Sequence, residues 1–148
     1  MAPTWTWTDW EGLSREQLYA ALRLRVAVFV VEQACAYQDL DGNDPLAHHL
    51  LGHDGGELVA YARVFGPGAL HDEPVIGRVV VAASHRGTGL GRMLMERAHH
   101  ELGHRFGARP VRLAAQAHLR QFYGSLGYEV CGPGYDEDGI PHLPMRRG

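Results

Sequence analysis

The chain has 148 residues, of which 45% are hydrophobic, so we expect a single domain over residues 1–148 with a sizeable core. Its formal net charge is −3, and it has no basic run with interleaved aromatic residues, which excludes nucleic acid as an expected partner. No signal pattern opens the sequence, and the longest apolar run, Val26 to Val31, is too short to span a bilayer, so no membrane location is expected.

The N-terminal stretch predicts an edge strand followed by a helix. Trp5 to Thr8 alternates apolar and polar residues, as a strand with one buried face does. Ser14 and Gln17 have the spacing of a capping box, and apolar residues then recur every three or four positions. This pattern predicts an amphipathic helix over about Arg15 to Phe29.

A polar loop, Tyr37 to Pro45, follows this helix. Its acidic residues suggest a calcium loop, which needs glycine at its sixth position and glutamate at its twelfth. Counted from Asp39, those positions hold Asp44 and Leu50. The calcium interpretation therefore fails, and we expect an Asx-rich turn that shapes a substrate entrance.

Two apolar runs, Ala47 to Gly52 and Leu58 to Phe65, flank Asp54-Gly55-Gly56, which predicts a β-hairpin. Six histidines here and later in the chain include pairs that are four residues apart, but zinc would need a third ligand, so surface histidines are preferred and no metal is expected. They are His48, His49, His53, His99, His100 and His104. Two isolated cysteines, Cys35 and Cys131, favour a reducing cytoplasm.

The central stretch predicts a strand, a glycine turn and a helix in direct succession. Val75 to Val81 is apolar and β-branched, Gly87, Gly89 and Gly91 follow, and a helical pattern starts at Leu90. Such an order gathers free backbone N–H groups at the positive end of a helix, where an anion is stabilised. Glycine allows a phosphate to approach the backbone closely. We therefore predict a pyrophosphate site here.

The spacing of the glycines narrows the choice of ligand. A P-loop needs a lysine, which this chain lacks, and a dinucleotide fingerprint needs G-x-G-x-x-G instead of the G-x-G-x-G found here. Arg86 and Arg92 flank the turn, and guanidinium groups pair well with phosphate. Residues 75–148 carry ten arginines against six acids (+4), whereas residues 1–74 carry four against eleven (−7). A tight packing turn is the less favoured alternative, and the acidic half suits a cationic acceptor such as an amine.

The remaining elements are shorter. The helix after the glycines buries a stripe of Leu90, Leu94, Ala98 and Leu102, and Pro110 to Gln116 predicts the next strand. His118 to Gly127 predicts a short helix, after which a strand begins at Tyr128. Gly139 to Met145 contains two prolines, which predict an edge strand or an extended tail.

This order of elements, together with Arg86-Gly87-Thr88-Gly89-Leu90-Gly91, resembles the GNAT N-acetyltransferase superfamily. Residues Phe122 to Tyr128 are similar to its F-Y-x-x-L-G-F motif, with Tyr128 in place of phenylalanine. Four further segments resemble the ElaA-like branch, namely Leu24–Gln33, Tyr37–Gly42, Ala114–Leu119 and Glu137–His142. The resemblance implies an α/β (α+β) acyl-CoA N-acyltransferase fold, with a mixed central sheet of about six to seven strands flanked by helices.

The resemblance also implies an activity, the transfer of an acetyl group from acetyl-CoA directly to an amine on a small molecule or peptide. The pantetheine arm would pair with Val79, Val80 and Val81, and the pyrophosphate would bind the turn. The residues of that turn are Arg86, Gly87, Thr88, Gly89, Leu90, Gly91 and Arg92. No metal is implied, and a homodimer through sheet edges is an expectation of the resemblance alone.

Direct transfer requires a proton for the leaving thiolate and a route for the amine proton. The family motif makes Tyr123 the candidate acid, although its helical spacing also fits a packed aromatic residue. Glu32 is a candidate base or a partner in an ion pair, and a water chain is the alternative route. Gln33, Gln116, His118 and His142 are candidate acceptor-binding residues. The competing functions are a non-catalytic acyl-CoA-binding module and an unrelated phosphate-binding domain.

Overall fold

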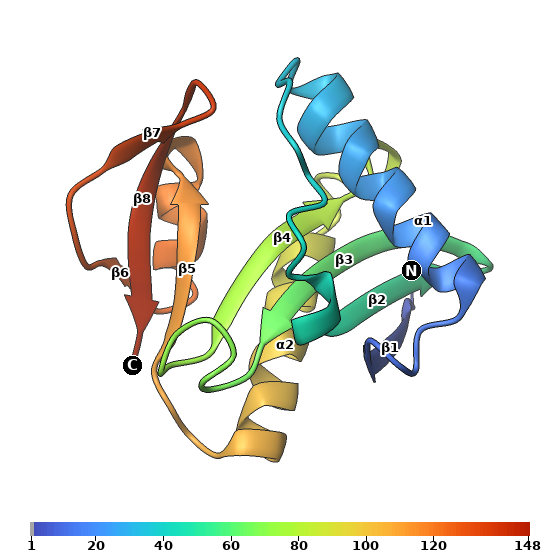
Figure 1. Ribbon diagram of the computed structural model, residues 1–148, viewed down its shortest axis with the longest axis horizontal. Helices are drawn as coiled ribbons and strands as arrows, with labels where there is room; N and C mark the ends of the chain where they lie inside the picture. Colours follow the sequence, from blue (N-terminus) through green and yellow to red (C-terminus); the bar gives the residue numbers. More distant parts are fainter. Residues whose placement is uncertain (1) are drawn as a thin grey trace.

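A single mixed sheet of eight strands organises the computed structural model, which describes residues 2–148 (Figure 1). The strand order is β1-β2-β3-β4-β5-β8-β6, and β7 pairs with β8. All neighbours are antiparallel except β4 and β5, which are parallel. The strands are β1 (Thr4–Asp9), β2 (His48–Asp54), β3 (Glu57–Phe65), β4 (Val75–Val81), β5 (Val111–Gln116), β6 (Tyr128–Val130), β7 (Tyr135–Glu137) and β8 (Ile140–Arg147). The predicted edge strand and hairpin are confirmed, whereas β7 was not predicted.

Two helices cover opposite faces of the sheet, with α1 in front of β2–β4 in Figure 1 and α2 behind them. The helical segments are α1 (Arg15–Arg25), η1 (Val26–Glu32), η2 (Asp44–Leu46), η3 (Ala83–His85), α2 (Leu90–Phe106), η4 (Ala117–Leu119) and α3 (Arg120–Gly124). None of the helices in residues 2–148 combines the length and the apolar character needed to cross a membrane.

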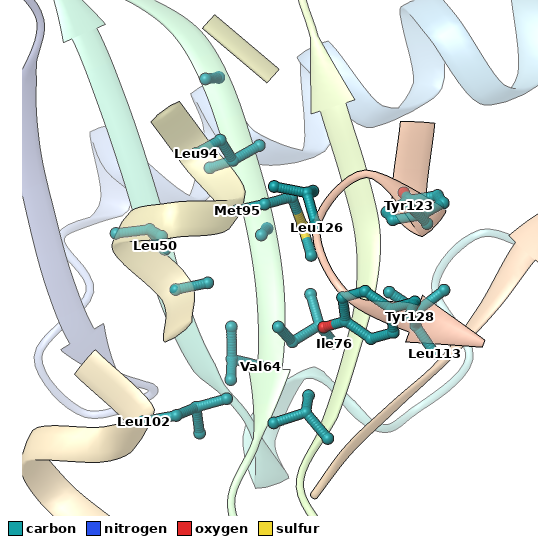
Figure 2. Close-up of a cluster of buried hydrophobic side chains, with 14 of the residues drawn as sticks. Leu50, Val64, Ile76, Leu94, Met95, Leu102, Leu113, Tyr123, Leu126 and Tyr128 are labelled. Atoms are coloured by element: carbon teal, nitrogen blue, oxygen red, sulfur yellow. The ribbon is translucent and has the colours of Figure 1, made fainter. Parts of the chain in front are cut away.

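The larger part of the core lies between α2 and the sheet (Figure 2). The predicted stripe on α2 is confirmed, since Leu90, Leu94, Ala98 and Leu102 are each at most 3% exposed. They pack against strand residues such as Leu50, Val64 and Ile76. A smaller cluster of Ala21, Val28, Leu51, Tyr61 and Val80 joins α1 and η1 to the other face. Burial on both faces explains why β3 is an almost continuous apolar run.

The first helix ends earlier than its pattern predicts. Its capping box is present, with Ser14 and Gln17 each bonding to the backbone N–H of the other. The α-helix stops at Arg25, however, and η1 continues as a seven-residue π-helix, so the prediction of one helix to Phe29 is wrong. The valines of η1 are β-branched and disfavour a helix interior. π-Helical turns are rare and occur often at functional sites.

Strand β8 corrects the expectation of an edge strand or tail, because it lies inside the sheet between β5 on one side and β6 and β7 on the other. Pro144 is tolerated there for a geometric reason. The carbonyl of Pro144 accepts a hydrogen bond from Cys131 N–H at 2.9 Å, so the proline nitrogen also faces the side of β6 and β7. No hydrogen bond to β5 is lost there.

The parallel strands β4 and β5 meet at one end only. Their register contains a single residue pair, Val75 with Arg112, whereas β5 and β8 pair along six residues. Beyond that pair the two strands diverge (Figure 1). Glu73 closes the joined end, since its carboxylate accepts hydrogen bonds from Arg112 Nε at 2.6 Å and Arg146 Nη2 at 2.8 Å.

Replacing Glu73 with glutamine is expected to make the stability of the protein depend less on pH in acid. Hydrogen bonds from Arg146 and then Arg112 lower the pKa of Glu73 from its ordinary 4.5 to about 2. A depressed carboxyl pKa stabilises the fold above the unfolded pKa, and this contribution is lost as the pH falls through the folded pKa. The difference in melting temperature between wild type and Glu73→Gln should therefore shrink between about pH 4.5 and pH 2. A constant difference over that range would contradict the prediction.

Candidate active site

The divergence of β4 and β5 opens a cleft of about 1160 Å³ that receives residues from both halves of the chain. The C-terminal end of β4 and the glycine turn form one wall, and the C-terminal end of β5 with the β7–β8 hairpin forms the other. The η1 segment and the loop after it complete the lining. Residues that are distant in sequence therefore meet around one space.

The glycine turn has the strand–turn–helix geometry that the sequence predicts. Gly87 and Gly89 have φ values of +75° and +83°, which side-chain-bearing residues rarely adopt. Gly89 is the N-cap of α2, and no side chain caps this helix end. The first N–H groups of a 17-residue helix are thus left without a side-chain partner beside the cleft.

The side chains of the turn lie in different environments. Arg86 donates to Glu32 Oε2 at 2.7 Å, and Arg92 donates to the Ser125 hydroxyl. The Thr88 hydroxyl donates to the carbonyl of His85 at 2.6 Å and stabilises the turn, so Thr88 does not line the cleft. The other predicted turn residues do line it, namely Arg86, Gly87, Gly89, Leu90, Gly91 and Arg92.

Strand β4 contains a bulge within the wall of the cleft. Tyr61 pairs with Val80 and Arg63 with Gly77, so Arg78 and Val79 together face a single residue of β3. Arg78 has a left-handed φ of +48°, an uncommon conformation for a residue other than glycine. The bulge interrupts the ladder beside Val79, Val80 and Val81, which all line the cleft. No pattern in the sequence predicted this bulge.

Tyr123 lies at the end of α3 and lines the cleft, although it is only 6% exposed. Figure 2 shows it beside Tyr128, and its ring meets that of Tyr128 edge-on, with centroids 5.9 Å apart. Burial raises the pKa of Tyr123 to about 12, without a contribution from any hydrogen bond. The residue is both a packed aromatic and a protonated hydroxyl group in the wall of the cleft.

Four predicted acceptor-binding residues lie along the same cleft. Gln33 and Gln116 form a reciprocal amide pair, with N···O distances of 3.1 and 3.4 Å. His142 is the sheet partner of Gln116, and its ring stacks on Tyr135. His118 is exposed and lines the cleft without belonging to this pair. The fold therefore brings Gln33 and Gln116 into contact although they are 83 positions apart in the chain.

Glu32 forms an ion pair, which is the second of the two roles that the sequence left open for it. Its carboxylate forms an ion pair with Arg86, and both side chains are about two-fifths exposed, at 42% and 43%. It contacts the glycine turn, at one end of the cleft. The structure thus places Glu32 beside the group expected to bind phosphate.

Sequence reasoning missed a partly buried ionic cluster on the α1 face, which we define as Arg25, Arg63, Arg78, Asp39, Asp41 and Asp44. Arg25 Nε donates to Asp39 at 2.9 Å and its Nη1 to Asp44 at 2.7 Å. Arg63 pairs with both oxygens of Asp41, at 2.8 and 3.0 Å. Arg78 Nε donates to Asp39 at 2.8 Å. The predicted Asx-rich turn is therefore fixed in the cleft wall by three arginines.

His49, a neighbour of this cluster, is buried, so the expectation that the histidines lie on the surface is wrong for this residue. His49 is 1% exposed and lies between the Tyr61 hydroxyl at 2.6 Å and the carbonyl of Asp44 at 3.0 Å. Desolvation by burial lowers the pKa of His49, so the ring is uncharged at neutral pH. Among the residues described, no three His, Cys, Asp or Glu side chains are grouped so that they could hold a metal ion.

Comparisons with known proteins agree with this architecture. The model of the acetyltransferase (GNAT) domain family matches residues 13–147. Protein ElaA of Escherichia coli K12 is 48% identical over 137 residues, which covers 91% of this chain and 90% of that protein. The crystal structure of an acyl-CoA N-acyltransferase from Pseudomonas aeruginosa has a TM-score of 0.94 at 44% identity, and covers 99% of this chain and 100% of its own. Escherichia coli ElaA superposes with a TM-score of 0.91.

Proposed function

The chain belongs to the GNAT acetyltransferase family and is an acyltransferase, and we propose that it transfers an acetyl group from acetyl-CoA directly to an amine acceptor. The observation that carries the proposal is the uncapped N-terminus of α2, preceded by two left-handed glycines, at the end of a cleft between diverging strands. The acceptor is a small molecule or a peptide. Two free cysteines in the described residues support a reducing compartment such as the cytoplasm.

The proposed cofactor path runs along β4. The pyrophosphate binds the backbone N–H groups of residues 87–92, helped by the guanidinium groups of Arg86 and Arg92. The pantetheine arm follows Val79–Val81, where the bulge at Arg78 interrupts the ladder to β3. The thioester is then placed in the wide part of the cleft, where the strands have separated.

Tyr123 is the proposed general acid. The amine nitrogen attacks the thioester carbon, the carbon–sulfur bond breaks, and the departing sulfur takes a proton from the Tyr123 hydroxyl. Burial keeps this phenol protonated, so it can always donate a hydrogen to the sulfur. Its raised pKa also makes it a weaker acid than a thiol, so the transfer to sulfur is completed only when the phenolate regains a proton. Solvent protons then restore the phenol.

His142 is the proposed acceptor of the amine proton. Its Nδ1 lies 2.7 Å from the carbonyl of Ile140, and since a carbonyl only accepts, Nδ1 must carry a hydrogen. In the neutral ring the lone pair is therefore on Nε2, which is 3.7 Å from a carboxylate oxygen of Glu137. The amide pair of Gln33 and Gln116, together with His118, supplies hydrogen bonds for the acceptor.

Calorimetric titration with acetyl-CoA tests the proposal most directly. Wild type should bind saturably, and Gly89→Val should weaken binding at least about 100-fold, because a side chain at φ +83° distorts the turn and displaces phosphate from its N–H donors. Gly68→Val is the matched control, since Gly68 has a φ of +86° and open space around it but lies outside the cleft.

Folded wild-type protein that does not bind acetyl-CoA would overturn the proposal. Binding followed by acetylation of an amine in a broad panel supports the enzyme. Binding with no transfer to any amine or peptide would instead favour the non-catalytic acyl-CoA module.

A further inference from the structure

Residues 32–35, which we name the strap, connect the two walls of the cleft. Glu32 bonds Arg86 of the glycine turn at 2.7 Å, and Gln33 pairs with Gln116 at the end of β5. The Cys35 thiol donates to the carbonyl of Asp138 in the β7–β8 turn at 3.4 Å. Three side chains within four residues thus reach three separate elements, and each of them lines the cleft.

The backbone of the strap is held in an unusual conformation. Ala34 has a φ of +49°, in the left-handed region that favours glycine, and its N–H bonds the carbonyl of Val31 at 3.2 Å. The N–H of Cys35 bonds the carbonyl of Val30 at 3.0 Å. This tight turn directly after the π-helix η1 allows Glu32, Gln33 and Cys35 to face different parts of the cleft.

The contact between Glu32 and Arg86 has a chemical consequence, given the proposed function on which it rests. A carboxylate and a phosphate are both anions that bind guanidinium through charge-assisted hydrogen bonds. In this structure the guanidinium of Arg86 is already bonded to a carboxylate. Arg92 differs, because it bonds a neutral hydroxyl and its nearest carboxylate, Glu96, is 3.9 Å away.

We propose that Glu32 is an internal competitor of the cofactor, which holds Arg86 in the unliganded protein and is displaced when the CoA pyrophosphate binds. Binding of CoA then detaches the first contact of the strap. Glu32 is a positioning residue in this account: it acts on the cofactor only through Arg86. The pair joins positions 54 residues apart, so its formation depends on the fold.

Calorimetric titration with CoA measures this competition without the need for an acceptor. Glu32→Gln should tighten CoA binding about two- to fivefold, the range expected for release of one exposed ion pair. In an Arg86→Gln background the same Glu32→Gln change should have no effect on the dissociation constant, because the competition no longer exists. Glu96→Gln is the charge-matched control beside Arg92, and it should leave CoA affinity within about 1.5-fold of wild type. All three side chains are exposed, at 42% for Glu32, 43% for Arg86 and 61% for Glu96, so these variants should fold.

Unchanged or weaker CoA binding by Glu32→Gln would overturn the competition while leaving the proposed function intact. The same gain in the Arg86→Gln background, or an equal gain from Glu96→Gln, would also overturn it, because the effect would then be one of general charge. If wild type does not bind CoA at all, both the competition and the proposed function fail.

Discussion

Replacing Arg25 with methionine is expected to lower the free energy of unfolding by about 3–5 kcal/mol, the cost of breaking a buried ion pair by removing one partner. Arg25 is 1% exposed and bonds Asp39 and Asp44, which are 4% and 6% exposed. Methionine fills much of the same volume but leaves the two carboxylates with one fewer cation. Urea unfolding followed by circular dichroism measures the change.

The charges in this cluster depend on one another. Burial lowers the pKa of Arg25, but the hydrogen bond to Asp44 and the negative charges around it outweigh burial and raise the pKa above its ordinary value. Burial likewise raises the pKa of Asp44, and the hydrogen bond from Arg25 with the charges of Arg25 and Arg63 reverses the direction and lowers it. Each partner therefore stabilises the ionised form of the other.

Arg23→Met is the matched control, because Arg23 is exposed on the same helix. It should change the free energy of unfolding by no more than about 0.5 kcal/mol. A loss of less than about 1 kcal/mol in Arg25→Met would show that Arg63 and Arg78 compensate both carboxylates without Arg25. The cluster would then not be what fixes the loop to the sheet.

The cluster also links the loop to the cleft. Arg78 lies in the β4 bulge and bonds the side chain and the carbonyl of Asp39, at 2.8 and 3.1 Å. Arg25 reaches the same carbonyl from α1, at 3.1 Å. One aspartate therefore connects the first helix, the loop and the strand along which the pantetheine arm is proposed to lie.

Local patterns in the sequence predicted those features that depend on neighbouring residues. The apolar stripe of α2, the capping box at Ser14 and the glycine turn each arise from residues that are close to one another in the sequence. The predicted site residues Gln33, Gln116 and His142 came from a family resemblance, and the fold brings them to one cleft.

The features that were missed depend on contacts between distant residues. Arg25 could have been recognised as unusual, because it lies near the apolar seam of its helix, but its partners are 14 and 19 positions away on a loop. The prolines of β8 suggested an edge strand because the sequence does not show which side a missing N–H would face. Glu32 had two open roles, and Arg86 lies 54 residues away.

Replacing Tyr123 with phenylalanine is expected to lower kcat for acetyl transfer by about 10²- to 10⁴-fold, the usual contribution of a general acid. The affinity for acetyl-CoA should be unchanged, because the packed ring remains. Stability should also change little, since no hydrogen bond contributes to the pKa of its hydroxyl. Release of the CoA thiol, with an acceptor found by screening amines, measures kcat.

The pH dependence gives a second measurement on the wild type. A phenol acts as an acid only while it is protonated, and an ordinary phenol is half ionised near pH 10. Burial raises the pKa of Tyr123 to about 12, so kcat should not fall through loss of this proton below about pH 11. A fall centred near pH 10 that disappears in Tyr123→Phe would show that the hydroxyl is more solvated than its 6% exposure indicates.

Tyr128→Phe is the matched control, and it is expected to lower stability without changing kcat. Tyr128 packs against Tyr123 but does not line the cleft, and its hydroxyl lies 2.7 Å from His99 Nε2. Its loss should cost about 1 kcal/mol of stability and leave kcat unchanged. If Tyr123→Phe retains full turnover, Tyr123 is only a packed aromatic residue and the thiolate takes its proton from water. Because the two variants differ in whether they change kcat or stability, an indirect effect through packing would be recognised by its appearance in both.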